Sequence, residues 1–292
     1  MKHALAIVLA VCAAFASAQS GVYNEVSGWV NFDTFEETYE GETPNGPLSG
    51  GMSLPGIGDA SAYANVGFGV NRAQATLRGT SSAPMEEGSA GALSGTWDAF
   101  TISDPALDGT MGSFISRLYA QGTGSFEIAP ELLASSDVLF DGGWEAGIIL
   151  DASGVSVTQT AYFGGSWNKP FYADDLLYDG DELNAYTGDF EFFFVYGQPI
   201  SIETYLRTGF VTQNYGTTGG LFEATVDLGN SVYWGGFSAV RDGNGNLVDG
   251  YDYQSDSGFD YRQNSAPVPE PASLAVLGLG VAFLERRRRS QR

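Results

Sequence analysis

The stretch FEFFFVY (190–196), followed by GQP (197–199) and ISIETYLR (200–207), decides the fold class of this chain. Residues 190, 192, 194 and 196 are all aromatic, so a β-strand would place them on one face. After the Gly-Gln-Pro segment, which favours a turn, Ile200, Ile202, Thr204 and Leu206 alternate with Ser201, Glu203, Tyr205 and Arg207. We therefore predict two strands, each with one buried face.

The same period of two recurs elsewhere along the chain. It appears at Phe222, Ala224, Val226 and Leu228, at Val155, Val157, Gln159 and Ala161, and between Ile115 and Tyr119. Clusters of Gly, Asp, Asn and Thr at 141–143, 217–220 and 242–246 predict turns between strands. The pattern is typical of an all-β, antiparallel sandwich, built either as one unit or as two packed β subdomains.

Two segments depart from the strand pattern. Residues 130–134 begin with Pro130 and predict a short helical turn that covers an open end of the sandwich. Residues 40–71 are rich in Gly, Pro, Ser and Ala with little periodicity, so we expect long loops there.

The C-terminal end combines a rigid neck, an apolar run and an arginine cluster. Pro269 and Pro271 fix φ and lack an amide donor, so a helix can begin only at or after Pro271. A helix over 272–284 would be about 20 Å long, shorter than the roughly 30 Å of bilayer hydrocarbon. Its apolar membrane segment consists of Leu274, Leu277, Leu279, Val281, Phe283 and Leu284. The cytoplasmic anchor consists of Arg286, Arg287, Arg288 and Arg289, which favour the inner side and leave the preceding chain outside.

This tail, residues 267–292, resembles the PEP-CTERM sorting signal of exported bacterial proteins, with Val268, Pro269, Glu270 and Pro271 at its motif. The resemblance implies that an exosortase-like membrane protease cuts near the motif after transient membrane insertion. It also implies that the outer part then passes to the cell surface or to extracellular polysaccharide. A plain membrane anchor and a basic disordered end are the alternatives.

The N-terminal end predicts export through the secretion machinery. Lys2 precedes an apolar stretch over 4–16, and Ala16-Ser17-Ala18 supplies the small residues of a signal-peptide cleavage site. We predict a signal helix over 1–18, a cut after Ala18 and an exported passenger over 19–266. Because the only histidine is His3 and the only cysteine is Cys12, the exported chain would contain neither. This excludes a disulfide, an ordinary zinc site, a Ser-His-Asp triad and a thiol nucleophile.

The passenger is strongly acidic. The chain has 35 acidic and 13 basic residues, and setting aside Glu270, Glu285, Lys2 and the five tail arginines leaves 33 and 7. A net charge of about −26 repels nucleic acid and anionic lipid, and is compatible with cations or neutral glycans. Acidity that only keeps an exported protein soluble is the simpler explanation.

Two acidic segments contain side chains that are candidate calcium ligands. Asp242, Asn244, Asn246 and Asp249 begin like a calcium loop, but Leu247 and Tyr253 stand where that loop needs Gly and Glu, so a hairpin loop is favoured. The segment with Asp174, Asp175, Asp179, Asp181 and Glu182 could bind Ca²⁺ weakly, although a solvated acidic loop explains it as well. No metal site or other cofactor is therefore predicted beyond weak calcium binding.

The aromatic residues allow a third kind of site. The set contains Trp29, Trp97, Trp144, Trp167 and Trp234, and most are expected to fill the core or pair across strands. Exposed members could stack on sugar rings. We therefore predict a non-enzymatic surface protein of structural or adhesive type. A glycan-binding module is the alternative, and a glycoside hydrolase that uses only carboxylates is a third possibility.

Overall fold

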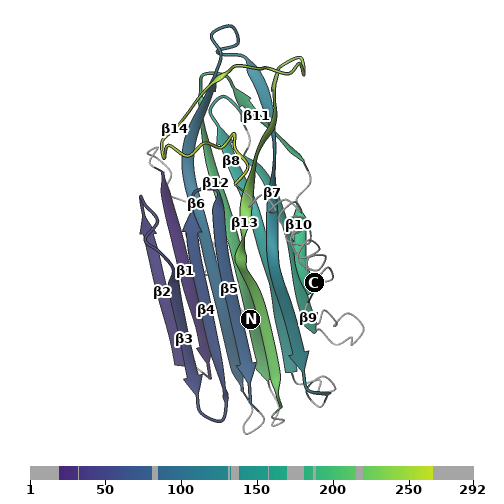
Figure 1. Ribbon diagram of the computed structural model, residues 1–292. Helices are drawn as coiled ribbons and strands as arrows, with labels where there is room; N and C mark the ends of the chain where they lie inside the picture. The colour runs from purple at the N-terminus through teal and green to yellow at the C-terminus, as the bar shows by residue number, and fades with distance from the viewer. Residues whose placement is uncertain are drawn as a thin grey trace, which may run out of the picture.

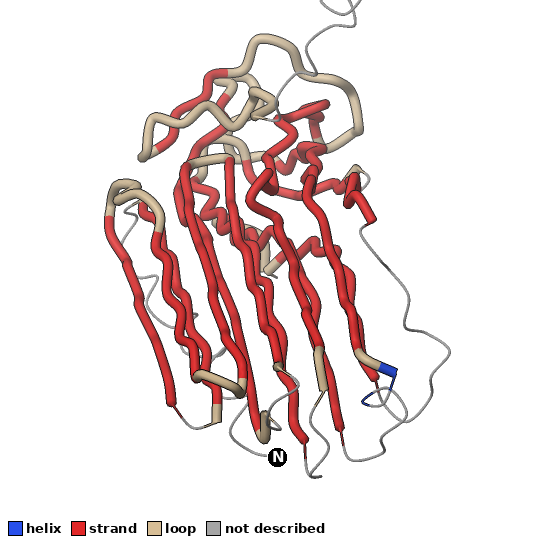
Figure 2. Tube along the Cα trace, turned by 60° about the horizontal axis from the view of Figure 1, so that its bottom comes forward, coloured by secondary structure: helices blue, strands red, loops and turns tan. Residues whose placement is uncertain are grey.

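The structure, a computed structural model, describes residues 20–31, 33–80, 85–130, 132, 138–156, 158–169, 181–186, 189–214 and 220–265. Nearly all of this described chain is β-strand, and the strands run side by side along one long axis (Figure 2). Figure 1 labels them in chain order. Their bounds are β1 (Gly21–Val30), β2 (Asp33–Gly41), β3 (Leu48–Leu54), β4 (Gly58–Gly67), β5 (Val70–Gly79), β6 (Glu87–Ser103), β7 (Met111–Ile128), β8 (Val138–Ala152), β9 (Gln159–Lys169), β10 (Asp181–Tyr186), β11 (Phe190–Val195), β12 (Pro199–Asn214), β13 (Phe222–Asp242) and β14 (Asp252–Ser255).

The strands form two antiparallel sheets that pack face to face as a sandwich. The first sheet has the order β2-β1-β6-β12-β8-β9, with β14 pairing with β6. The second sheet has the order β10-β7-β13-β5-β4-β3, with β11 pairing with β7. In both sheets a strand from late in the chain, β12 or β13, lies between strands formed much earlier. The predicted antiparallel β-sandwich is confirmed, with one sandwich in place of two subdomains.

Inward-facing side chains from both sheets form one hydrophobic core. The alternation predicted over 190–206 is confirmed, because Phe192, Phe194, Ile200, Ile202 and Leu206 are all at most 2 % exposed. The prediction for β13 is also confirmed, since Phe222, Ala224, Val226 and Leu228 are buried. Near one end of the sandwich the core is aromatic: the ring of Phe100 packs against Phe114 at 5.8 Å and Tyr261 at 5.3 Å between centroids.

The loops expected over 40–71 are wrong, because β3, β4 and the start of β5 occupy most of that segment. Ala60, Ala62 and Ala64 alternate with polar residues and are at most 5 % exposed. Alanine contributes little β propensity, so the alternation was hidden by the abundance of small residues. In the sandwich these alanines let the second sheet approach the first closely.

Three local predictions are tested by strand pairing and backbone hydrogen bonds. The turn expected at 141–143 is wrong, since these residues lie within β8 and pair with both β12 and β9. The strand expected from Val155 begins only at Gln159, after a turn in which the Val155 amide bonds the Ala152 carbonyl at 2.9 Å. The turn at 242–246 is confirmed by a hydrogen bond of 2.9 Å from the Gly245 amide to the Asp242 carbonyl.

The short helical turn expected from Pro130 is partly described. Pro130 and Leu132 have helical backbone geometry, and the Leu132 side chain is 2 % exposed and belongs to the core. Among the described residues, no helix has both the length and the apolar character needed to cross a membrane.

Candidate functional site

The residues predicted to direct export and sorting lie outside the described part of the chain. This applies to the signal cleavage residues Ala16 and Ala18, to the motif at 268–271, to the apolar run and to Arg286–Arg289. It applies also to Asp174, Asp175 and Asp179, while Asp181 is described only as the first backbone position of β10. The structure therefore bears on the passenger and on the segment that leads to the tail.

The outer face of the first sheet carries a row of small residues that crosses its strands. In this row Gly209 of β12 pairs with Gly91 of β6 on one side and with Gly143 of β8 on the other. Ser27 and Ser166 continue the row on β1 and β9. Five neighbouring strands thus have glycine or serine in register.

The row forms the floor of a groove with a cavity volume of about 440 Å³. One wall contains Ser89, Val211 and Asp141, which are directly paired across β6, β12 and β8. The opposite wall contains Arg207 and Glu145, whose guanidinium Nη2 and carboxylate Oε2 are 3.1 Å apart. Grooves of this size on a protein surface are large enough for a small organic ligand.

Beside the groove, three aromatic rings lie over glycines of the neighbouring strand. A Cβ atom at Gly147 would meet the Tyr205 ring at 2.5 Å, and one at Gly95 would meet the Tyr23 ring at 2.3 Å. A Cβ at Gly21 would meet the Trp97 ring at 2.1 Å. The rings therefore rest on the backbone of the sheet. The rings of Tyr23 and Trp97 stack with 21° between their planes, and Trp97 is the more exposed of the two.

The same face is acidic. Glu25, Glu145 and Glu203 stand at outward positions, and Arg207 is the one base among the described side chains of this face. Burial raises the pKa of Glu203, and the hydroxyl of Tyr23, which donates to Glu203 at 2.8 Å, opposes that shift. Burial, followed by repulsion from Glu36, raises the pKa of Glu25. Glu25 and Glu203 are thus partly shielded from water.

The outer face of the second sheet differs in its charges. There Arg78 bonds Glu223 at 2.8 Å and lies 3.8 Å from Asp59, and Arg117 forms an ion pair with Asp189. Arg78 and Arg117 thus offset part of the acidity of this face, which also carries the exposed Glu127 opposite Glu223.

The tryptophans divide between the core and this face. Trp144 and Trp234 are 7 % and 1 % exposed and belong to the core, whereas Trp29 and Trp97 stand partly exposed at outward positions of the first sheet. The side chain of Trp167 lies outside those described. The glycine row itself was missed, because its members are spread over more than a hundred residues of the chain. Glycine within a strand was the available signal, since it permits close approach of a ligand.

The calcium candidate at 242–249 is a hairpin loop. The Asp242 carboxylate accepts hydrogen bonds from the amides of Asn244 and Asn246, both at 2.9 Å, and from the Asn246 side chain at 3.0 Å. These bonds lower the pKa of Asp242 and use its oxygens within the turn. Among the described residues, no group of three or more His, Cys, Asp or Glu side chains could hold a metal ion.

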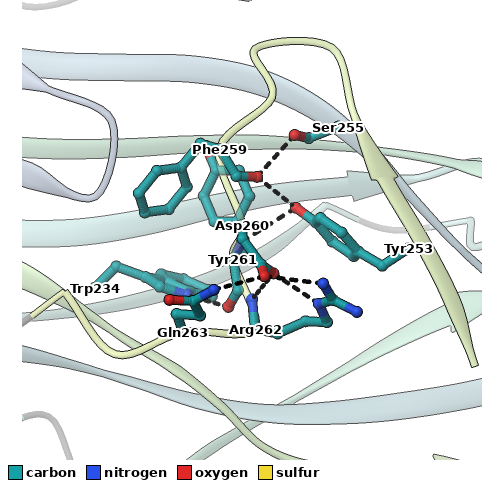
Figure 3. A network of polar contacts seen from close by, with 8 residues as sticks. All are labelled: Trp234, Tyr253, Ser255, Phe259, Asp260, Tyr261, Arg262 and Gln263. Carbon is teal, nitrogen blue, oxygen red and sulfur yellow. Dashed lines mark hydrogen bonds and ion pairs between the residues drawn. The ribbon is translucent and has the colours of Figure 1, made fainter. Parts of the chain in front are cut away.

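The segment that precedes the sorting tail is fastened to the sandwich. Tyr261 is fully buried, and its carbonyl accepts a hydrogen bond of 2.7 Å from the Trp234 indole (Figure 3). The Tyr253 hydroxyl donates to the Phe259 carbonyl at 3.1 Å, and the Ser255 hydroxyl donates to it at 2.7 Å. The last described residue, Ser265, bonds the Trp234 carbonyl through its amide at 2.8 Å. The described chain therefore ends at a residue that is bonded to the sandwich.

Comparison with known proteins identifies the tail. The family model for the PEP-CTERM protein-sorting motif matches residues 267–289. The C-terminal segment thus carries a PEP-CTERM sorting motif. A motif of this kind implies a protein that is exported and processed by an exosortase.

The passenger shows little resemblance to known proteins. No curated protein matches the chain. One solved structure, from work on the promiscuous specificity of carbohydrate-binding modules of the β-sandwich superfamily, is similar at 10 % identity. The match covers 75 % of this chain and 85 % of that one with a TM-score of 0.18, a value too low to support any argument.

Proposed function

We propose that this chain is a non-enzymatic cell-surface or extracellular-matrix protein of structural or adhesive type. After export, an exosortase-like protease removes its PEP-CTERM tail, and the sandwich is passed to the cell surface. The observation that carries the proposal is the sorting motif at 267–289, which lies directly behind a passenger whose end is fixed to its own core.

The predicted export route supports this role. A passenger that begins at residue 19 contains no histidine or cysteine, so it has none of the nucleophile and base pairs that most hydrolases use. A sandwich whose two outer faces are each formed by a seven-stranded sheet in the described chain suits adhesion, which requires surface area more than an enclosed pocket.

The proposal is tested in the native host by mass spectrometry of the surface fraction. We expect peptides that end before the arginine cluster, and no peptide that continues through Arg286 in membrane-free material. Deletion of the exosortase-like protease should retain the full tail in the membrane fraction.

A motif variant separates processing from folding. Replacing Pro269, Glu270 and Pro271 by alanine should leave uncut protein in the membrane. The control variant replaces Ser290 and Gln291, which lie beyond the matched residues, and should be processed normally. Equal surface delivery of both variants would contradict the proposal.

Glycan binding is the second candidate function. It is favoured by the groove and by the partly exposed rings of Tyr205 and Trp97 on the outer face of the first sheet, because aromatic rings suit stacking against sugar rings. Pull-down with host polysaccharide tests it, and release of reducing ends in the same assay would instead indicate a glycosidase.

A further inference from the structure

We propose that the groove on the outer face of the first sheet binds an extended amino-sugar chain, that is, a glycan with free, protonated amines. This inference rests on the proposed delivery to surface polysaccharide, and it adds the site and the chemistry of the ligand.

The glycines of the groove floor are not explained by packing within the protein. A Cβ at Gly91 would meet nothing closer than 3.6 Å, and one at Gly209 nothing closer than 3.3 Å. In contrast, the glycines beside the groove lie beneath Tyr23, Tyr205 and Trp97 and could not carry a side chain without displacing a ring. The floor is therefore open toward solvent, where an added chain can approach the backbone.

The dimensions suit an extended polymer. The two walls are separated by four residues along β12, which corresponds to about 13 Å at the rise of a β-strand. The floor crosses β6, β12 and β8 at right angles to their direction, and the serines on β1 and β9 continue it at both ends. A chain can thus enter at the β9 edge of the sheet and run toward β1, where Glu36 of the edge strand β2 pairs with Ser27.

The aromatic rings beside the groove supply contacts for sugar rings. Tyr205 is partly exposed, and its hydroxyl donates to Glu145 at 2.8 Å, which holds the ring in place over Gly147. Tyr23 is held in the same way through Glu203 at 2.8 Å but is only 8 % exposed. Tyr205 and Trp97 are therefore the rings available for stacking. Rings that are fixed before binding lose little conformational freedom when a ligand stacks on them.

The charges select an amine over a carboxylate on the ligand. Arg207 is the base of the groove, and Glu145 already neutralises it at 3.1 Å. Asp141 stands exposed on the opposite wall, and Glu25 flanks the end of the groove on β1. A uronic acid chain would meet net repulsion here, whereas protonated amines would form charge-assisted hydrogen bonds with these carboxylates.

The test compares ligands of equal length on the mature exported protein by isothermal titration calorimetry. We expect a β-1,4-linked glucosamine hexamer to bind at least about tenfold more tightly than its fully N-acetylated form. Its affinity should fall as salt is added. An oligogalacturonate of equal length should show no binding. Hexalysine serves as a control for charge alone, and equal affinity for hexalysine would overturn the inference, as would preference for the acetylated or anionic sugar.

Variants locate the site. Gly91→Leu fills the groove at a position with ordinary contact distances and should reduce glucosamine-hexamer affinity at least about tenfold. Gly67→Leu is the matched control, because a Cβ there meets nothing within 4 Å on the second sheet, and its affinity should not change. Asp141→Asn should weaken the glucosamine hexamer and leave the acetylated hexamer unaffected. Unchanged affinity in Gly91→Leu would refute this site.

The outcome is separable from that of the proposed function. Normal tail processing together with no binding of the glucosamine hexamer would overturn only this inference. If the protein at the cell surface binds the glucosamine hexamer but still carries its arginine cluster, only the proposed removal of the tail would be overturned.

Discussion

At the scale of single residues, polar side chains are placed between the two sheets at the centre of the sandwich. Asn71 of β5 donates to the Thr204 hydroxyl at 3.1 Å, and Thr204 and Thr96 form a hydrogen bond at 2.8 Å across β12 and β6. Close by, the side-chain amide of Asn24 is 2 % exposed and has no hydrogen-bond partner among the described residues. The core is therefore not optimised for stability at this point.

The unpaired amide gives a prediction for Asn24→Leu. A buried polar group without a partner costs about 1–3 kcal/mol, so an apolar side chain of similar size should raise the free energy of unfolding by a comparable amount. Urea unfolding followed by tryptophan fluorescence measures the change. A variant less stable than the parent would show that the amide is satisfied by another group.

A second prediction concerns Asp98, which is 3 % exposed on β6. Burial raises its pKa above the ordinary value of 3.8, although the amides of Ala99 and Ser257 donate to it at 2.8 and 3.1 Å. Because the folded-state pKa is raised, the contribution of Asp98 to stability is complete below the ordinary value of 3.8 and is lost as the pH rises through the folded-state pKa. Asp98→Asn never carries the charge, so its stability relative to the parent should increase as the pH is raised. Parallel curves in urea unfolding at several pH values would count against this.

Asp260 should behave with the opposite sign. The Arg262 guanidinium holds it at 2.7 and 2.9 Å and lowers its pKa to about 2 (Figure 3). Its contribution to stability is present above the ordinary value of 3.8 and is lost as the pH falls toward about 2. Asp260→Asn is therefore expected to be less stable than the parent at neutral pH, and the two should converge in acid. The same unfolding series measures both carboxylates.

The sequence predicted individual buried residues where large apolar side chains alternate. Phe192, Phe194 and Ile200 were assigned correctly for this reason. The groove could not be predicted, because Gly91, Gly143 and Gly209 come together only through the register of three strands that are distant in the chain. The period of two predicts which face of a sheet a residue lies on, but it does not predict which residues lie beside it on the adjacent strands.

At the scale of elements, the edge strand β2 is protected by charge. It pairs only with β1 in the first sheet, and it carries Glu36, Glu37 and Glu40 within nine residues, most of them exposed. Charged side chains on an edge strand oppose pairing with another molecule through its free amide and carbonyl groups. The acidity of this part of the chain therefore has a structural role.

This protection can be removed. Replacing Glu36, Glu37 and Glu40 by threonine keeps the β propensity and eliminates the repulsion, so we expect dimers or fibrils to form at neutral pH. Size-exclusion chromatography and thioflavin T fluorescence detect them. A variant with threonine at Glu127 and Glu223, which lie on inner strands of the second sheet, controls for the loss of charge and should stay monomeric.

Element boundaries were predicted where turns and apolar strands are distinct and were missed where both are built from small residues. The Gly-Gln-Pro turn between β11 and β12 was correct, since large side chains flank it. Residues 48–67 failed because Gly, Ser and Ala are typical of loops and also of closely packed strands. Whether these residues form strands depends on their packing against the opposite sheet, and the neighbouring sequence does not contain that information.

At the scale of the whole molecule, the segment from β14 to Ser265 closes one end of the sandwich, as Figure 1 shows. A chain that ends at Ser265 retains the buried Tyr261 and its bond to Trp234, and should be as stable as the full exported chain. A chain that ends at Gly258 loses both Phe259 and Tyr261, and should lose at least about 3 kcal/mol of stability. Thermal unfolding of the two truncations checks this, and equal melting temperatures would contradict it.

The order of the strands also governs how export and folding must be timed. β12 separates β6 from β8 and β13 separates β7 from β5, yet both strands follow their neighbours in the chain. A chain that crosses the membrane from its N-terminus therefore delivers the middle of each sheet after most of the flanks. Until residue 214 has emerged the first sheet has a gap bordered by unpaired backbone groups, and the second sheet has one until residue 242 has emerged. Translocation halted before that point should consequently leave a protease-sensitive, aggregation-prone partial protein.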